Sequence, residues 1–330
     1  MEYSNLIEKL ITGDTRAAAR LITLVENDIQ AAEKIINGLY KYTGNAYIIG
    51  ITGAPGSGKS TFISMFTKKL IKQNKKIGII CVDPTSPLSG GALLGDRIRM
   101  KENFSLDNVF IRSMANRMQL GGLARATEDV IKILDAYGCD IILVETVGVG
   151  QSEVDIFKSA HTVVVLLVPG LGDDIQAIKA GIMEITDIFV VNKMDLEGAD
   201  KKVADITQML ELGMNFKYSN DITEKSFAKI KQWTPEIVKV NSRTGENFDE
   251  FLRVIEKHKT FLSDSGIISS YEMNRIKNET FQILKYKLEK KVRKLLSTNS
   301  LIDDYIKLVM DKNLDPYSMA NLIIKLIGID

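Results

Sequence analysis

The stretch that most restricts how this chain can fold runs from Gly53 to Ser60 and reads Gly-Ala-Pro-Gly-Ser-Gly-Lys-Ser. An apolar run at residues 47–51 precedes it, and a helical pattern opening at Thr61 follows. Glycines let the backbone N–H groups of such a turn point inward at an anion, which the positive end of the next helix also faces. The spacing therefore predicts a phosphate-binding loop. The residues expected to hold the phosphates are Gly53, Ala54, Pro55, Gly56, Ser57, Gly58, Lys59, Ser60 and Thr61.

Two side chains of this loop have distinct expected roles. Lys59 is expected to reach the β- and γ-phosphates of a nucleotide, and the Ser60 hydroxyl to bind Mg²⁺. A glycine-rich turn that matches by chance is the alternative. The strand before the loop and the helix after it argue against that alternative.

Charge and cysteine content exclude several classes of protein. The 330 residues include 43 basic and 42 acidic side chains, so the net charge favours neither nucleic acid nor an anionic membrane as a partner. Cys81 and Cys139 have no CxxC or Cys/His partner nearby, which is typical of free thiols in a reducing compartment. No apolar run approaches the length of a membrane span. We expect a cytoplasmic protein.

Strand and helix patterns alternate from residue 45 to residue 262. The apolar runs are too uniform to be buried on one face only, which predicts an α/β fold with a mostly parallel sheet covered by helices on both faces. Together with the phosphate-binding loop, this is the P-loop NTPase fold. The expected strands are residues 46–51, 76–82, 108–112, 140–145, 162–168, 187–191 and 236–240.

Helical segments flank this domain. Residues 1–44 read as a helical N-terminal extension with a structural role, and residues 263–330 as a C-terminal helical arm. Within the arm, Tyr271 to Leu296 reads as one long helix with an apolar face and a basic face. Nucleic-acid or membrane binding by the basic face is possible in principle, but a solvated face of a helix that packs or dimerises is favoured. Asp315 and Pro316 mark the start of the last helix.

Acidic side chains follow two expected strands, where ligands of a parallel sheet bind. Asp83 ends the second strand, a place suited to holding a metal-bound water or orienting the attacking one. Asp96 is a second candidate for the metal shell, and turn or helix capping is the alternative for both. Glu145 closes a buried strand, which is costly unless it faces a metal or a polar cleft. The Gly148 N–H is a candidate sensor of the γ-phosphate.

Two loops are candidate moving segments. Gln151, in the loop 149–153, is a candidate for positioning water, although a solvated glutamine without a role fits as well. Residues 169–174 are rich in glycine, and a plain strand-to-helix connection is an equal alternative there. The expected catalytic residues are Lys59, Asp83, Glu145 and Gln151.

Asn192-Lys193-Met194-Asp195 closes the sixth expected strand and identifies the nucleotide as GTP or GDP. A carboxylate at Asp195 accepts hydrogen bonds from guanine N1–H and the exocyclic amine, a pattern that adenine does not present. Asn192 is expected to brace the loops, while the Lys193 stem covers the base. A further base-contacting loop is expected after the seventh strand, at residues Asn241, Ser242 and Arg243.

Together these motifs resemble the MeaB/ArgK group of P-loop GTPases, the metallochaperone-like GTPases associated with methylmalonyl-CoA mutase. The resemblance covers nearly the whole chain, including the tail at residues 315–318. One departure is Asn241-Ser242-Arg243, where many GTPases have a Ser-Ala pair. The stretches that carry the resemblance are residues 53–60, 82–87, 90–100, 145–153, 172–181 and 192–195.

The resemblance implies a function and a set of partners. It implies a Mg²⁺-dependent GTP hydrolase that assists an adenosylcobalamin-dependent acyl-CoA mutase, by gating cofactor loading and protecting or reactivating the mutase. It also implies homodimerisation through the C-terminal arm, a response of the loop at 170–179 to the mutase, and an acidic metal shell. The metal shell would comprise Ser60, Asp83, Asp96 and Glu145.

Two other functions remain open. A nickel-insertion GTPase should show a Cys/His metal site, and two isolated cysteines with His161 and His258 argue against one. A protein kinase acting on a periplasmic binding protein is an older assignment for this group. The guanine-reading pattern at residues 192–195 argues against that assignment.

Overall fold

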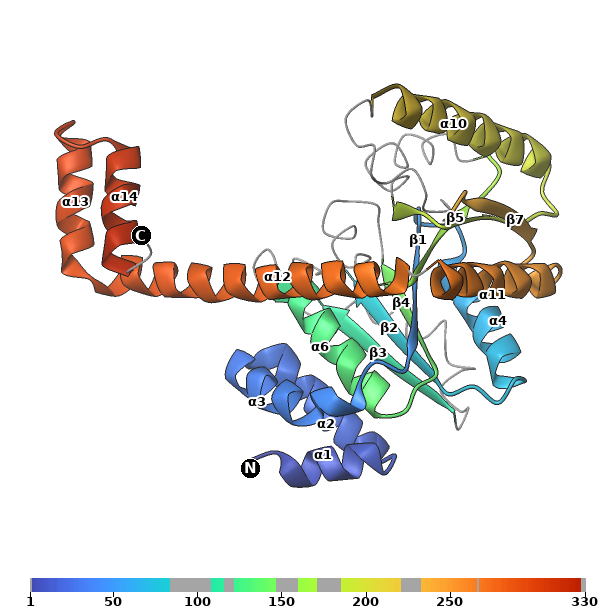
Figure 1. Ribbon diagram of the computed structural model, residues 1–330, viewed down its shortest axis with the longest axis horizontal. Helices are drawn as coiled ribbons and strands as arrows, with labels where there is room; N and C mark the ends of the chain where they lie inside the picture. Colours follow the sequence, from blue (N-terminus) through green and yellow to red (C-terminus); the bar gives the residue numbers. More distant parts are fainter. Residues whose placement is uncertain are drawn as a thin grey trace. The chain divides into compact units, whose positions relative to one another are not determined.

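The computed structural model describes residues 2–83, 108–115, 122–146, 160–170, 185–220, 233–265 and 267–327. The chain forms two compact units, residues 1–276 and 277–330. The first unit contains the sheet and the N-terminal helices (Figure 1). The second unit is helical.

All seven strands expected from the sequence form, and the described strands pair into one parallel sheet. Its order, β3-β2-β4-β1-β5-β6-β7, places the first strand between the fourth and the fifth. Because the strands are parallel, their carboxyl ends meet at one edge of the sheet. The strands are β1 (Tyr47–Gly53), β2 (Ile77–Asp83), β3 (Val109–Ala115), β4 (Ile141–Thr146), β5 (Thr162–Leu167), β6 (Ile188–Asn192) and β7 (Glu236–Val240).

Both faces of the sheet are buried, as the uniformly apolar strands predict. Ile48 of β1 contributes to one apolar cluster with α2 (Thr15–Asn27), α3 (Ile29–Leu39) and α6 (Gly122–Ala136). The next residue, Ile49, belongs to a second cluster on the opposite face. Successive side chains of a strand point to opposite faces, so each strand contributes to both layers.

The second cluster is built from α4 (Lys59–Ile71) and α11 (Phe248–Asp264), which cover that face in Figure 1. Four fully buried phenylalanines form its centre, and Phe251 lies 5.0 Å from both Phe62 and Phe66 between ring centroids. Such aromatic pairs add roughly 0.5–1.5 kcal/mol each beyond the burial of their area. This packing anchors α4, whose first turn carries Lys59 and Ser60. The four residues are Phe62, Phe66, Phe248 and Phe251.

The N-terminal extension forms α1 (Ser4–Ile11), α2 and α3, as predicted. The Asp14 carboxylate caps α2 by accepting hydrogen bonds from two backbone N–H groups at 2.7 and 3.0 Å. Arg112 of β3 pairs with Glu26 of α2, and Arg125 of α6 donates to the Val25 carbonyl at 3.2 Å. These polar contacts and the shared apolar cluster attach the extension to the sheet domain.

A chain of polar side chains lies at the amino ends of the strands. The Tyr47 hydroxyl lies 2.5 Å from the Thr162 hydroxyl, which lies 2.9 Å from His258 Nδ1. His258 Nε2 is 3.4 Å from an Asp187 carboxylate oxygen, and the Val163 N–H donates to the other oxygen at 2.8 Å. These polar side chains therefore lie at the end of the sheet opposite the loop that Gly53 to Ser60 form.

Burial shifts the pKa values of two of these polar side chains, His258 and Asp187, in opposite directions. Loss of hydration, with a smaller contribution from nearby His161, lowers the pKa of His258 to about 4, so the imidazole is neutral. Loss of hydration raises the pKa of Asp187 to about 7, against the opposing Val163 hydrogen bond. About 23% of the Asp187 side chain still reaches solvent, so water screens part of the effect of burial. His161 itself accepts the Ile48 N–H at 2.9 Å, in keeping with a packing role.

The second unit contains the end of α12 (Ile267–Thr298), with α13 (Ser300–Met310) and α14 (Pro316–Ile327). The Asp315 carboxylate accepts the N–H groups of Tyr317 at 2.8 Å and Ser318 at 3.1 Å, which confirms the predicted start of the last helix. In the part of the chain that the structure describes, no helix has the length and apolar character needed to cross a membrane.

Candidate nucleotide-binding site

The loop from Gly53 to Ser60 connects the end of β1 to the start of α4. Gly58, the residue before the helix, has a left-handed backbone with φ of +87°. A Cβ atom there would lie 2.6 Å from Asn192 Nδ2, so both the conformation and the close approach require glycine. The first turn of α4 thus opens toward the edge of the sheet where the strands end.

The Lys59 ammonium is held within the loop. Lys59 is only 7% exposed, and its Nζ donates to the Gly53 carbonyl at 2.7 Å and the Ala54 carbonyl at 3.2 Å. These contacts keep a positive charge beside the backbone that the sequence predicts to surround the phosphates. The geometry suits a lysine that binds an anion entering the loop.

Two oxygen-bearing side chains that could bind a metal, Ser60 and Glu145, lie close together near Lys59. The Ser60 hydroxyl donates to Glu145 Oε1 at 3.5 Å, and Glu145 is 1% exposed. The Cys81 thiol donates to the other carboxylate oxygen at 3.7 Å, because β2 pairs with β4 in a register that sets Cys81 beside Glu145. A hydroxyl and a carboxylate are the hard oxygen ligands that Mg²⁺ prefers, so this pair fits the metal.

The turn after β6 carries the residues predicted to read the base. Asn192 is 1% exposed and its Nδ2 donates to the Ser57 carbonyl at 2.8 Å, which connects the turn to the phosphate-binding loop. Lys193 has φ of +56° and donates to the Gly56 carbonyl at 3.1 Å. The Asp195 carboxylate is exposed. Asn192 thus braces the loops, as its position in the sequence predicts.

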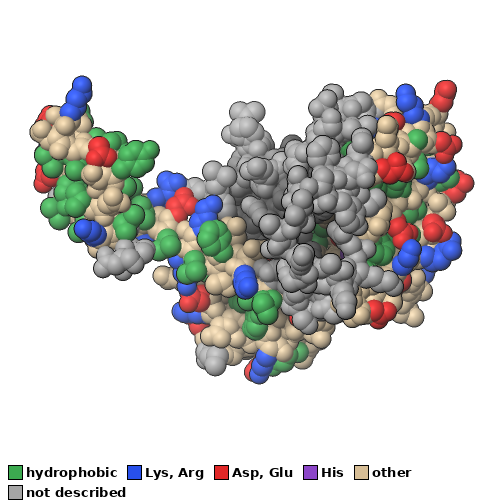
Figure 2. Space-filling view, turned by 45° about the horizontal axis from the view of Figure 1, so that its top comes forward, with side chains coloured by type: hydrophobic (Ala, Val, Ile, Leu, Met, Phe, Trp, Pro, Cys, Tyr) green, Lys and Arg blue, Asp and Glu red, His purple; other side chains and the backbone are tan. Residues whose placement is uncertain are grey.

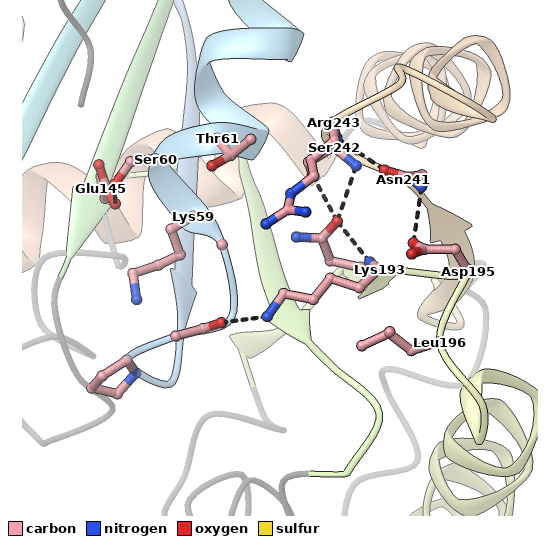
Figure 3. Close-up of a pocket in the computed structure, with 14 residues that line it drawn as sticks. Lys59, Ser60, Thr61, Glu145, Lys193, Asp195, Leu196, Asn241, Ser242 and Arg243 are labelled. Carbon is pink, nitrogen blue, oxygen red and sulfur yellow. Dashed lines mark hydrogen bonds between the residues drawn. The ribbon is translucent and has the colours of Figure 1, made fainter.

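A third loop follows β7 and contacts both ends of that turn. The Ser242 hydroxyl donates to Asn192 Oδ1 at 2.7 Å, and Asn241 Nδ2 donates to Asp195 Oδ1 at 2.8 Å. Register pairing of Asn192 with Val240 places the two loops side by side. Figure 3 shows these contacts as dashed lines.

These three loops enclose a cavity of about 580 Å³ (Figure 3). Its lining unites the phosphate-binding loop, Glu145 and both loops predicted to read the base, although they lie far apart in sequence. Leu196, which is 46% exposed, also lines the cavity and was not expected. Its position directly after Asp195 was the available signal. The lining residues are Pro55, Gly56, Gly58, Lys59, Ser60, Thr61, Glu145, Asn192, Lys193, Asp195, Leu196, Asn241, Ser242 and Arg243.

Several expected site residues lie outside the described part of the chain. Asp83 ends β2, but its side chain is outside that part. Asp96, Gly148, Gln151 and most of the loop at 170–179 also lie outside it. Within the described ranges, no three His, Cys, Asp or Glu side chains gather closely enough to hold a metal ion.

Comparison with known proteins identifies the family. The sequence pattern of "Methylmalonyl Co-A mutase-associated GTPase MeaB" matches residues 18–297. The chain belongs to the MeaB family of GTPases. A Pyrococcus horikoshii protein whose name assigns it as a GTPase is 51% identical to this MeaB-family chain over 324 residues, which cover 98% of each protein. GTPase ArgK of Escherichia coli is 31% identical, over 91% of this chain and 88% of its own.

A solved structure shares the fold of this MeaB-family GTPase. It is described as a LAO/AO transport system kinase, with 25% sequence identity, a TM-score of 0.67, and coverage of 98% of this chain and 97% of its own. The predicted family, the P-loop fold and the assignment as a GTP hydrolase are thereby confirmed.

Proposed function

We propose that this MeaB-family GTPase assists an adenosylcobalamin-dependent acyl-CoA mutase, either methylmalonyl-CoA mutase or a relative. It would gate the loading of the cofactor and protect or reactivate the mutase, in the cytoplasm. The observation that carries the proposal is the match of residues 18–297 to a family described as mutase-associated. The cavity beside Lys59 supports it, because a switch of this kind needs a nucleotide site.

At the phosphate end of the cavity, we assign Lys59 to the β- and γ-phosphates. Ser60 and Glu145 would hold Mg²⁺, with Asp83 and Asp96 completing the acidic shell. When bound, Mg²⁺ neutralises charge on the phosphate oxygens. We assign Gln151 to the attacking water and the Gly148 N–H to the γ-phosphate. Phosphoryl transfer of this kind depends mainly on positioning and charge neutralisation, so slow intrinsic hydrolysis and acceleration by a partner are expected.

At the other end, we assign the Asp195 carboxylate to guanine N1–H and the exocyclic amine. Its exposure and its place on the cavity lining support that role. Lys193 reaches back to the Gly56 carbonyl, so its aliphatic stem extends along the cavity and offers an apolar surface to the base. Because adenine presents a different edge, this end of the cavity would select GTP over ATP.

The mutase role is tested by purifying the protein from its native host and identifying what accompanies it. GTP hydrolysis is then measured with and without that partner. We expect a cobalamin-dependent mutase to co-purify and to raise the turnover rate, while Lys59→Ala abolishes hydrolysis in both conditions. Absence of a mutase together with an unchanged rate would reject the chaperone role and leave the GTPase assignment intact.

We further propose a homodimer formed through the helical arm expected over residues 263–330. Figure 2 shows apolar side chains gathered over α13 and α14. Met310 is 76% exposed and Tyr317 is 85% exposed, which is unusual for large apolar side chains gathered on one small unit. Sedimentation velocity should give twice the mass of one chain, and Met310→Lys should shift the protein toward monomer. A monomer at micromolar concentration would contradict the proposal.

A further inference from the structure

Asn241 lines the cavity and makes hydrogen bonds through both its backbone and its side chain. It is 8% exposed, its backbone N–H donates to the Glu246 carbonyl at 3.2 Å, and its carbonyl accepts the Gly245 N–H at 2.9 Å. Its side-chain Oδ1 accepts two further N–H groups, from Arg243 at 3.0 Å and Thr244 at 3.3 Å. The Asn241 side chain therefore shapes the turn in which it lies.

These contacts determine which way the amide points. A side-chain oxygen accepts hydrogen bonds and the NH₂ group donates them, so two backbone N–H donors identify Oδ1. The opposite side of the amide, Nδ2, must then face Asp195, where it donates at 2.8 Å. Because both lone pairs of Oδ1 are occupied, that oxygen has no capacity left to bind a base.

Asp195 needs such a partner. Its side chain is exposed, and a carboxylate free to rotate about two bonds meets a base in the right orientation only part of the time. A donor held on Oδ1 leaves Oδ2 directed elsewhere and restricts both torsions. A hydrogen bond to an ionised group is stronger than one between neutral groups, so the Asn241 amide can hold the carboxylate in one orientation.

We infer that Asn241 is a positioning residue for guanine selection: it holds the Asp195 carboxylate in the orientation that reads the base and makes no contact with the base itself. The inference rests on the guanine site proposed above. The inference also gives a role to the departure from the Ser-Ala pair of many GTPases. The Asn241 side chain is longer than that of serine, so it closes its own turn and still reaches Asp195.

The decisive variant is Asn241→Asp. It retains an oxygen to accept the Arg243 and Thr244 N–H groups, so the turn is preserved, but it replaces the donor to Asp195 by a second acceptor. GDP affinity, measured by calorimetry on the full chain, should fall at least about tenfold, the equivalent of one lost hydrogen bond to a charged group. The KM for GTP should rise in step with the loss of GDP affinity, whereas a collapsed turn would lower kcat as well.

Asn247→Asp is the matched control. Asn247 lies in the same loop, donates its Nδ2 to the Lys239 carbonyl at 2.6 Å, and does not line the cavity. Its φ of +62° is one that Asp tolerates, so the substitution adds the same charge and removes a comparable donor. We expect GDP affinity within about twofold of the unsubstituted protein.

Asp195→Ala separates a positioning role from a direct contact. In that background Asn241→Asp should change GDP affinity less than about threefold, since the carboxylate it orients is gone. If the losses of GDP affinity multiply in the double variant, the positioning role of Asn241 is overturned, while the proposed guanine site stands. An unsubstituted protein that binds ADP as tightly as GDP would refute the guanine site itself, and the inference with it.

Discussion

Replacing Gly58 by alanine tests how the loop from Gly53 to Ser60 and the turn after β6 depend on each other. The new methyl group would meet Asn192 Nδ2 at 2.6 Å, well inside van der Waals contact. Asn192 is held by the Ser57 carbonyl on one side and by the Ser242 hydroxyl on the other. The amide must leave its place, and buried polar groups then lose their partners.

The expected cost follows from two separate effects. A left-handed backbone at a residue with a Cβ costs about 1–2 kcal/mol. Displacing the Asn192 amide leaves buried groups unpaired at about 1–3 kcal/mol each. With one such group left unpaired, Gly58→Ala should therefore destabilise the nucleotide-free protein by about 2–5 kcal/mol. Gly56→Ala is the matched control, because Gly56 has φ of +86° but no atom within 4 Å of its Cβ position. It should cost only about 1–2 kcal/mol.

Urea unfolding measures both variants without nucleotide. The single tryptophan, Trp233, packs 4.6 Å from the His258 ring and reports on the sheet unit by fluorescence. In an Asn192→Ala background, Gly58→Ala should cost no more than Gly56→Ala does, because the amide that obstructs the methyl group is absent. Equal losses for the two glycine variants in the unsubstituted protein would refute the reasoning.

Three further predictions concern other parts of the chain. Burial raises the pKa of Asp187 from 3.8 to about 7, so its contribution to stability is greatest at low pH and is lost as the pH rises through 7. Between pH 5 and 8 the unfolding free energy should fall by up to about 2.5 kcal/mol relative to that of Asp187→Asn. Parallel pH profiles of the two proteins would contradict this. Phe251→Ala should lower the unfolding free energy in urea by about 3–5 kcal/mol, whereas Tyr40→Ala, at a site that is 51% exposed, should change it by less than about 0.5 kcal/mol. Cys81→Ala removes a donor from Glu145 and should raise the Mg²⁺ concentration needed for tight GDP binding about threefold, while Cys139→Ala, at the other buried cysteine, should leave that concentration unchanged.

Much of the fold was predictable because its signals are local. Apolar runs bounded by turns located all seven strands, and Asp315 followed by Pro316 located the last helix. The phosphate-binding loop was recognisable because its conformation depends on residues within eight positions of one another. Backbone dihedral preferences and side-chain periodicity act over that range, so a sequence carries them directly.

Strand order and the contacts between loops were not predictable in the same way. Glu145 meets Ser60 because β4 pairs with β1, and Asn241 reaches Asp195 because β7 pairs with β6. Both pairings are hydrogen-bond ladders between backbone segments, which are nearly alike for any sequence and leave no periodic signal. Likewise, nothing in the residues near His258 indicated that its partners would be Thr162 and Asp187.

The sequence by itself therefore determined that this chain is a P-loop GTPase of the MeaB family, since the motifs that define that class are short and contiguous. Only the tertiary structure decided which side chains of these motifs meet: that Glu145 lies beside Ser60, and that Asn241 donates a hydrogen bond to Asp195. The physical reason is that an amide or carboxylate acquires its function from its orientation. That orientation is set by neighbours distant in the chain.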